Sequence, residues 1–121
     1  MKIKNLSNKK ILANKAWMCR SLTERLRGLM FKRINPSQGC VLVNPNESVL
    51  DSSIHMMFVP QDLEIIWADS DLQVVKVKKC KRATLNPLTW RSYYPNKPAK
   101  YVIELLDAKN TLKGDKIRFI K

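Results

Sequence analysis

The sequence contains little glycine and a single histidine. Its glycines, Gly28, Gly39 and Gly114, lie far apart, so the chain has no glycine-rich loop whose backbone could cradle a phosphate group. His55 is the only histidine, which excludes metal sites and proton relays that need two imidazoles. These shortages argue against a nucleotide-binding loop and against an active site built on a histidine pair.

Cysteine is equally sparse. Cys19, Cys40 and Cys80 follow one another at intervals of 21 and 40 residues, whereas zinc knuckles and redox motifs use much shorter spacings. An odd number of widely spaced cysteines is typical of reduced thiols in a cytosolic protein. We therefore predict no metal and no other cofactor. We interpret Cys19, which precedes a predicted helix, as a buried, inert thiol in preference to a nucleophile.

Long apolar runs are absent as well. The longest, residues 54–60 and 63–68, are far too short to cross a bilayer. The first five residues are too polar for a secretory signal. The hydrophobic share of 45% is ordinary for a folded protein. We expect one domain, residues 1–121, with no membrane span and a cytoplasmic location.

Negative charge is also in short supply, since 23 lysines and arginines accompany 10 aspartates and glutamates, for a net charge of +13. The imbalance is segregated along the chain: residues 1–33 sum to +9, residues 34–75 to −6 and residues 76–121 to +10. Clustered cations raise the local concentration of polyanions. Nucleic acid or another polyanion is therefore a candidate partner, although a basic surface also keeps a small protein soluble.

One helix is predicted, from Leu22 to Phe31. Ser21 is a good N-cap, and Glu24 three residues later completes a capping box. Gly28 lowers helix stability by roughly 1 kcal/mol relative to alanine, so we expect it to mark a close packing contact. The residues expected on one apolar face are Leu22, Leu26, Leu29 and Met30.

Most of the remaining chain is predicted to form strands. Apolar segments with alternating patterns are bounded by turn residues, of which Asn44-Pro45-Asn46 form the plainest turn. We predict an α+β fold, a predominantly antiparallel or mixed β-sheet with one short helix, and strands that could close into a small barrel. The predicted strands are residues 10–18, 39–43, 52–57, 63–68, 73–79, 101–105 and 116–120.

Several motifs in the same order resemble the DUF192 (UPF0127) family. Residues 27–33, Arg-Gly-Leu-Met-Phe-Lys-Arg, resemble the Gly-Leu-Met signature on the family's single helix. Residues 54–56 and 63–69 resemble its Ile-His element and the strand that follows, and residues 101–105 and 113–115 resemble its closing Glu-Leu and Gly-Asp elements. The resemblance extends over about residues 10–120. It implies a mainly β fold with one helix, and it implies no reaction.

The first candidate site is a region containing Arg27, His55 and Glu64, because these residues lie in the motifs of the resemblance. His55 is a pocket residue in this interpretation, with Glu64 or Asp69 as its carboxylate partner. The alternative is a histidine that is simply hydrogen-bonded in the core or at a sheet edge, since one histidine among apolar residues carries little chemical specificity.

The second candidate site is the segment of residues 85–100, in which Trp90, Arg91 and Tyr93 occur among lysines. Such a combination can stack unpaired bases and hold phosphates. The alternative is that the aromatic rings cover one end of the core. The sequence thus leaves three hypotheses: a non-catalytic binding or accessory module that contacts a protein partner, a nucleic-acid or other polyanion binder, and an enzyme.

Overall fold

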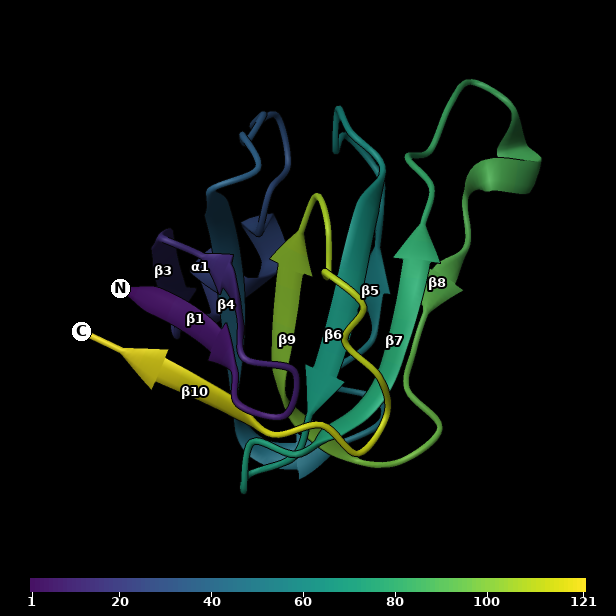
Figure 1. The fold of residues 1–121 in the computed structure, drawn as a ribbon. Coiled ribbons are helices and arrows are strands. Elements are labelled where there is room, and N and C mark those ends of the chain that lie inside the picture. Colours follow the sequence, from purple (N-terminus) through teal and green to yellow (C-terminus); the bar gives the residue numbers. More distant parts are fainter.

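The computed structural model describes the whole chain, Met1–Lys121, and is centred on a five-stranded sheet with the strand order β3-β4-β9-β6-β7 (Figure 1). Strand β3 runs parallel to β4, and the other neighbouring pairs are antiparallel. The strands are β3 (Lys15–Cys19), β4 (Gln38–Ser48), β9 (Ala99–Leu105), β6 (Leu63–Ala68) and β7 (Val74–Cys80).

Two smaller sheets accompany the central one. A three-stranded sheet has the order β10-β1-β2, and its β1 and β10 run side by side near the two chain ends (Figure 1). A two-stranded sheet pairs β5 with β8. The remaining elements are β1 (Lys2–Asn5), β2 (Lys10–Ala13), α1 (Leu22–Arg27), β5 (Ile54–His55), the short 3-10 helix η1 (Pro87–Thr89), β8 (Ser92–Tyr93) and β10 (Ile117–Ile120).

The core consists of two layers, one on each face of the five-stranded sheet. Alternate residues of a strand point to opposite faces, and accordingly Val41 of β4 and Ile103 of β9 pack against β1, β2 and β10. Leu42 and Val102 point the other way, toward β5, β8 and the segment that follows α1. Strands that are buried on both faces read as nearly continuous apolar runs.

The predicted fold class is confirmed, but the suggested barrel is wrong. The three sheets are open, with β3 and β7 at the edges of the largest. Exposed Lys78 and Lys79 lie on the β7 edge, and charged side chains on an edge strand oppose pairing with another chain. Edge protection therefore does not require closure.

The helix is shorter than predicted. It keeps the capping box of Ser21 and Glu24 but ends at Arg27, because Gly28 adopts a positive φ of 46°. Its predicted apolar face is not in the core: Leu22 is 63% exposed and Leu26 is 64% exposed, although Leu29 beyond the helix is buried. Leu22 and Leu26 of α1 therefore face away from the hydrophobic core.

Two predicted strands and one predicted turn also differ from the structure. The strand expected over residues 10–18 is split into β2 and β3 at Asn14, whose N–H donates to the Ser37 carbonyl at 2.8 Å. The strand expected over residues 52–57 contracts to β5, because the Ser52 hydroxyl donates to the Val49 carbonyl at 3.2 Å within a turn. The turn predicted at residues 44–46 lies inside β4, where the pairing with β9 is interrupted.

Candidate functional site

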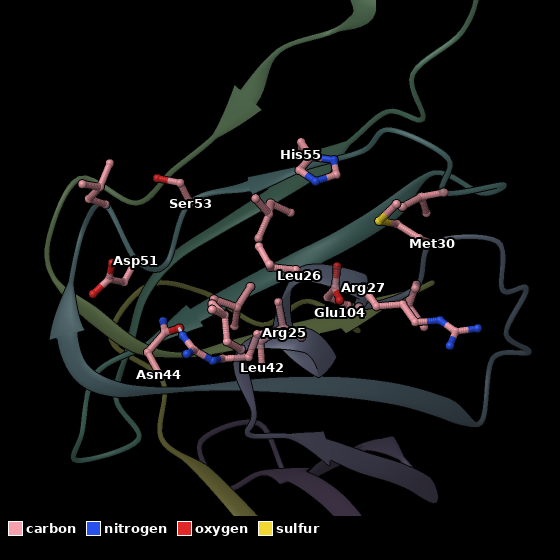
Figure 2. A pocket seen from close by; sticks show the side chains of 17 residues that line it. Arg25, Leu26, Arg27, Met30, Leu42, Asn44, Asp51, Ser53, His55 and Glu104 are labelled. Atoms are coloured by element: carbon pink, nitrogen blue, oxygen red, sulfur yellow. Dashed lines mark hydrogen bonds between the residues drawn. The ribbon is translucent and has the colours of Figure 1, made fainter.

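A cavity of about 260 Å³ lies on one face of the five-stranded sheet. Its floor is made by Leu42 and Asn44 of β4 with Val102 and Glu104 of β9. Helix α1 with the turn after it forms one wall, and the segment from Leu50 to His55 contributes another (Figure 2). We refer to this cavity below as the pocket.

Strand alternation explains why two polar side chains stand on this floor. Leu42 is directly opposite Val102, and Cys40 is opposite Glu104, in the antiparallel pairing of β4 with β9. Residues two apart on a strand share a face, so Asn44 continues the row begun by Cys40 and Leu42. A carboxyl and an amide are thereby placed on a face whose other members are apolar.

The first polar group of the pocket is a pair formed by Arg25 and Asn44. Arg25 Nη1 donates a hydrogen bond to Asn44 Oδ1 at 3.1 Å, and Figure 2 shows the Arg25 side chain directed toward Asn44. Asn44 is 2% exposed. Arg25 Nε and Asn44 Nδ2 are buried and have no hydrogen-bond partner. The pair therefore has two unused donors at the pocket.

The second polar group is Glu104, which is 4% exposed and whose Oε1 has no hydrogen-bond partner. Burial raises the pKa of this carboxyl to about 7, and the nearby Cys40 thiol lowers that pKa in part. Gly28 lies against it: a Cβ at residue 28 would be 3.0 Å from Glu104 Oε1. The prediction that Gly28 marks a close packing contact is confirmed, and the contact is with a carboxyl group.

Cysteine thiols lie behind the pocket. Cys19 Sγ and Cys40 Sγ are 3.3 Å apart, both side chains are buried, and all three cysteines are free. Burial raises the pKa of Cys19 and of Cys40, and it raises the pKa of Cys80 to about 12. Thiols with raised pKa values hold little thiolate at neutral pH, which matches the interpretation of Cys19 as an inert thiol.

The structure brings two of the three motif residues of the first candidate site together. Arg27 and His55 both line the pocket. The Arg27 side chain points away from Arg25 and Asn44 (Figure 2), and exposed His55 accepts a hydrogen bond at Nδ1 from the Met57 N–H at 3.2 Å.

Glu64 does not line the pocket. Its Oε1 accepts a hydrogen bond from the Ala108 N–H at 2.9 Å. This contact ties β6 to the chain that leaves β9, because Ala108 lies three residues after the end of that strand. The carboxylate of Glu64 thus has a structural partner, whereas that of Glu104 has an unpartnered oxygen.

The second candidate site divides into buried and exposed parts. Tyr93 lies in β8 and is buried in the core, as the packing alternative predicted. The Arg91 guanidinium lies 5.8 Å from the centre of its ring. Trp90 is 52% exposed, and its Nε1 donates to the Thr84 carbonyl at 2.6 Å. The segment between β7 and β8 projects away from the sheets (Figure 1), so Trp90 is accessible to a partner.

Sequence reasoning missed Arg25, Asn44 and Glu104. One signal was available for Glu104, an acid within the apolar run of residues 101–105, because carboxyls in strands covered on both faces are seldom buried without a reason. Asn44 was concealed by its neighbours Pro45 and Asn46, which together read as a turn. Nothing in the sequence distinguished Arg25 from the other arginines.

Several acidic side chains are occupied by backbone N–H groups. Asp62 accepts from Arg82, Asp69 accepts from Asp71 and Gln73, and Asp107 accepts from Lys109. Asp69 and Asp107 therefore hold local turns, and Asp62 joins two segments that are 20 residues apart in the chain. The structure contains no cluster of three or more histidine, cysteine, aspartate or glutamate side chains suited to a metal ion. None of its helices has the length and apolar character needed to cross a membrane.

Comparison with known proteins supplies a family and a fold. The DUF192 family model, described as "Uncharacterized ACR, COG1430", matches residues 3–119. A UPF0127 protein of Thermococcus kodakarensis is 38% identical over 95 residues, which cover 74% of this chain and 55% of that protein. A UPF0127 protein of Pyrococcus horikoshii is 37% identical over 103 residues, which cover 82% of each chain. The chain thus spans little more than half of the Thermococcus kodakarensis relative.

A solved structure has the same fold. The crystal structure of a protein of unknown function from Novosphingobium aromaticivorans matches with a TM-score of 0.76 and 17% sequence identity, over 98% of this chain and 82% of that one. At this level of identity the likeness concerns the fold alone.

Proposed function

The chain belongs to the DUF192 family, whose members are uncharacterised, and from its pocket we propose that it is a non-catalytic binding module for a small polar molecule. The observation that carries this proposal is the location of the unpartnered polar atoms. Arg25 Nε, Asn44 Nδ2 and Glu104 Oε1 are buried side-chain atoms without a hydrogen-bond partner, and all three residues line the same pocket.

Unpartnered buried polar atoms lower the stability of the folded protein. Each buried donor or acceptor without a partner costs about 1–3 kcal/mol, and more when the group is charged. Folded proteins contain few such groups, and here three of them converge on one cavity. A ligand that supplies the missing partners recovers this free energy on binding.

The size and lining of the pocket agree with a small ligand. Its volume of about 260 Å³ lies just below the usual range for sites that take drug-sized molecules, which begins at about 300 Å³. Apolar side chains with a few converging polar groups are typical of such sites. Binding without turnover is favoured because the thiols beside Glu104 have raised pKa values and the pocket contains a single imidazole.

A thermal-shift screen with a library of small polar metabolites tests this proposal. A ligand present at one hundred times its Kd stabilises the folded state by about 2.7 kcal/mol, which for a chain of this size raises the melting temperature by roughly 10 °C. We expect Asn44→Ala to lose most of that shift, because it removes a donor from the pocket. Asn46→Ala is the matched control, since Asn46 is exposed on the same strand. Equal shifts in both variants contradict the proposal.

Polyanion binding is the second candidate function, and the exposure of Trp90 favours it. Trp90 is half exposed on a projecting segment, and Tyr94, four residues later in the chain, is 55% exposed with Lys76 Nζ 5.9 Å from its ring centre. Aromatic faces next to cations stack unpaired bases.

Anisotropy titrations of a labelled single-stranded oligonucleotide at low and physiological salt test this second candidate. If Trp90 stacks on a base, binding persists at physiological salt and weakens by about tenfold or more in Trp90→Ala, because stacking contributes about 1–3 kcal/mol per base. Leu88→Ala, which alters another exposed apolar side chain of the same segment, serves as the control. Binding that disappears at physiological salt and is unchanged in Trp90→Ala contradicts this second candidate. It indicates that the net charge of +13 belongs to a solvated surface without a specific site.

A further inference from the structure

We propose that the pocket takes a small linear molecule with a carboxylate at one end and an ammonium group at the other, an inference that rests on the proposed function. The carboxylate lies against Arg25 and Asn44, and the ammonium group lies against Glu104. The chain between the two ends is aliphatic. Each of these three assignments follows from a different part of the pocket.

The carboxylate end is assigned from the two unused donors. Arg25 and Asn44 are held together by the bond from Nη1 to Oδ1 at 3.1 Å, and each member of this pair keeps one donor without a partner, Arg25 Nε and Asn44 Nδ2. Neighbouring N–H groups that include a guanidinium match the two oxygens of a carboxylate. This guanidinium donates its side-chain hydrogen bond to a neutral amide, so its positive charge favours an anionic ligand group.

The ammonium end is assigned from Glu104. Its Oε1 is a buried acceptor without a donor, and it lies close to Gly28, where a Cβ would be 3.0 Å from the oxygen. An isolated carboxylate in an apolar environment is strongly disfavoured unless a cation or donor accompanies it. An ammonium group supplies both a positive charge and up to three donors.

The aliphatic middle is assigned from the floor between the two ends. Asn44 lies four residues along β4 from Cys40, the partner of Glu104, which corresponds to a separation of about 13 Å along the strand. The pair formed by Leu42 and Val102 lies between them. Side chains at both ends shorten this span, and an apolar floor fits methylene groups better than polar ones.

Other charged or titratable groups also face the pocket or adjoin Glu104. Arg27 and His55 line the pocket, Asp51 lies on its outer wall, and the Cys40 thiol adjoins the carboxyl with Cys19 behind it. None of them supplies a hydrogen bond to Glu104 Oε1. An ammonium ligand requires ionised Glu104, and since burial raises the pKa of that carboxyl to about 7, affinity should increase from pH 6 to pH 8.

Calorimetric titrations with 5-aminopentanoate, pentanoate and pentylamine test the assignment, with 3-aminopropanoate and 6-aminohexanoate to vary the length. We expect one of the aminocarboxylates to bind at least about tenfold more tightly than both pentanoate and pentylamine, because each end adds a charge-assisted hydrogen bond. Its affinity should increase with pH in the wild type and in His55→Gln. A decrease with pH overturns the assignment, because it indicates that protonated Glu104 binds an acceptor.

Two variants locate the ends. Glu104→Gln should abolish the preference for the aminocarboxylate over pentanoate, while its binding of pentanoate is retained. Arg25→Gln should weaken both carboxylates by about tenfold or more, whereas Arg33→Gln, which removes an exposed arginine, should not. Aminocarboxylates that bind no better than pentanoate, or do not bind at all, overturn the ligand class if the pocket still binds compounds of the polar library. The proposed function itself fails if no compound, from the polar library or from the carboxylate and amine series, raises the melting temperature of the wild type more than that of Asn44→Ala.

Discussion

Replacing Glu104 by glutamine is expected to stabilise the ligand-free protein by about 3 kcal/mol at pH 8. Burial raises the pKa of Glu104 from 4.5 to about 7, and each unit of difference between folded and unfolded states corresponds to about 1.4 kcal/mol. The folded carboxyl holds its proton more tightly than the unfolded one, so its contribution to stability is lost as the pH rises from about 4.5 to about 7. Glutamine has the same shape and does not ionise.

Urea unfolding at pH 4.5, 6 and 8 measures this effect. The advantage of Glu104→Gln should be small at pH 4.5 and should grow until the pH exceeds 7. Glu64→Gln is the control on the same sheet, because Glu64 has a backbone partner at 2.9 Å and glutamine keeps an acceptor oxygen there. If Glu104→Gln is destabilising at pH 8, the carboxyl has a favourable partner in the folded protein and is not a vacant acceptor. Binding sites commonly contain residues that lower the stability of the folded protein, because function requires them there.

Truncation of Trp67 should cause the largest loss of stability. Trp67 is fully buried in β6 and belongs to the core layer on the pocket side of the sheet, and Trp→Ala in a core costs about 3–5 kcal/mol. Its Nε1 also donates to the Ser52 carbonyl at 2.7 Å. Ser52 lies within the segment from Leu50 to His55, which forms one wall of the pocket. The hydrogen bond from Trp67 therefore fixes that wall to the core.

Trp67→Phe separates these two contributions, because it keeps an aromatic ring but removes the donor. We expect it to cost about 1–3 kcal/mol, the penalty for leaving a buried carbonyl without its partner. Trp90→Ala is the control, since Trp90 also donates to a backbone carbonyl but is 52% exposed, and it should cost less than about 1 kcal/mol. Denaturant unfolding followed by circular dichroism measures all three variants. Equal losses for Trp67→Ala and Trp90→Ala contradict the assigned core.

Local patterns predicted the fold where the pattern and the pairing agree. The hairpin of β6 and β7 follows from apolar and alternating segments on either side of a polar turn, and the observed bounds of β6, Leu63–Ala68, are those predicted. The capping box of Ser21 likewise determines where α1 begins. Where it ends depends on the conformation of Gly28, and that conformation brings residue 28 against Glu104 on a strand 76 residues later in the chain.

The site was less accessible to sequence reasoning because it depends on long-range pairing. The motifs led to Arg27 and His55, which do line the pocket. They also led to Glu64, although the carboxyl on the floor of the pocket is that of Glu104. The sequence alone does not reveal that β4 pairs with β9, and this pairing places Asn44 and Glu104 on one face. Nor does it reveal which acid has a backbone partner and which does not.

If Arg25, Asn44 and Glu104 form one binding site, nuclear magnetic resonance of the ¹⁵N- and ¹³C-labelled protein should detect a bound ligand at all three side chains. The side-chain signals of Arg25 Nε–H and Asn44 Nδ2–H and the carboxyl carbon of Glu104 would be followed during titration with 5-aminopentanoate and with the best compound of the thermal-shift screen. We expect a bound compound to shift all three signals together and to slow exchange of the two N–H groups with water. Binding that leaves these three signals unchanged, while shifting signals of another surface such as the segment around Trp90, would show that the three residues do not form the binding site.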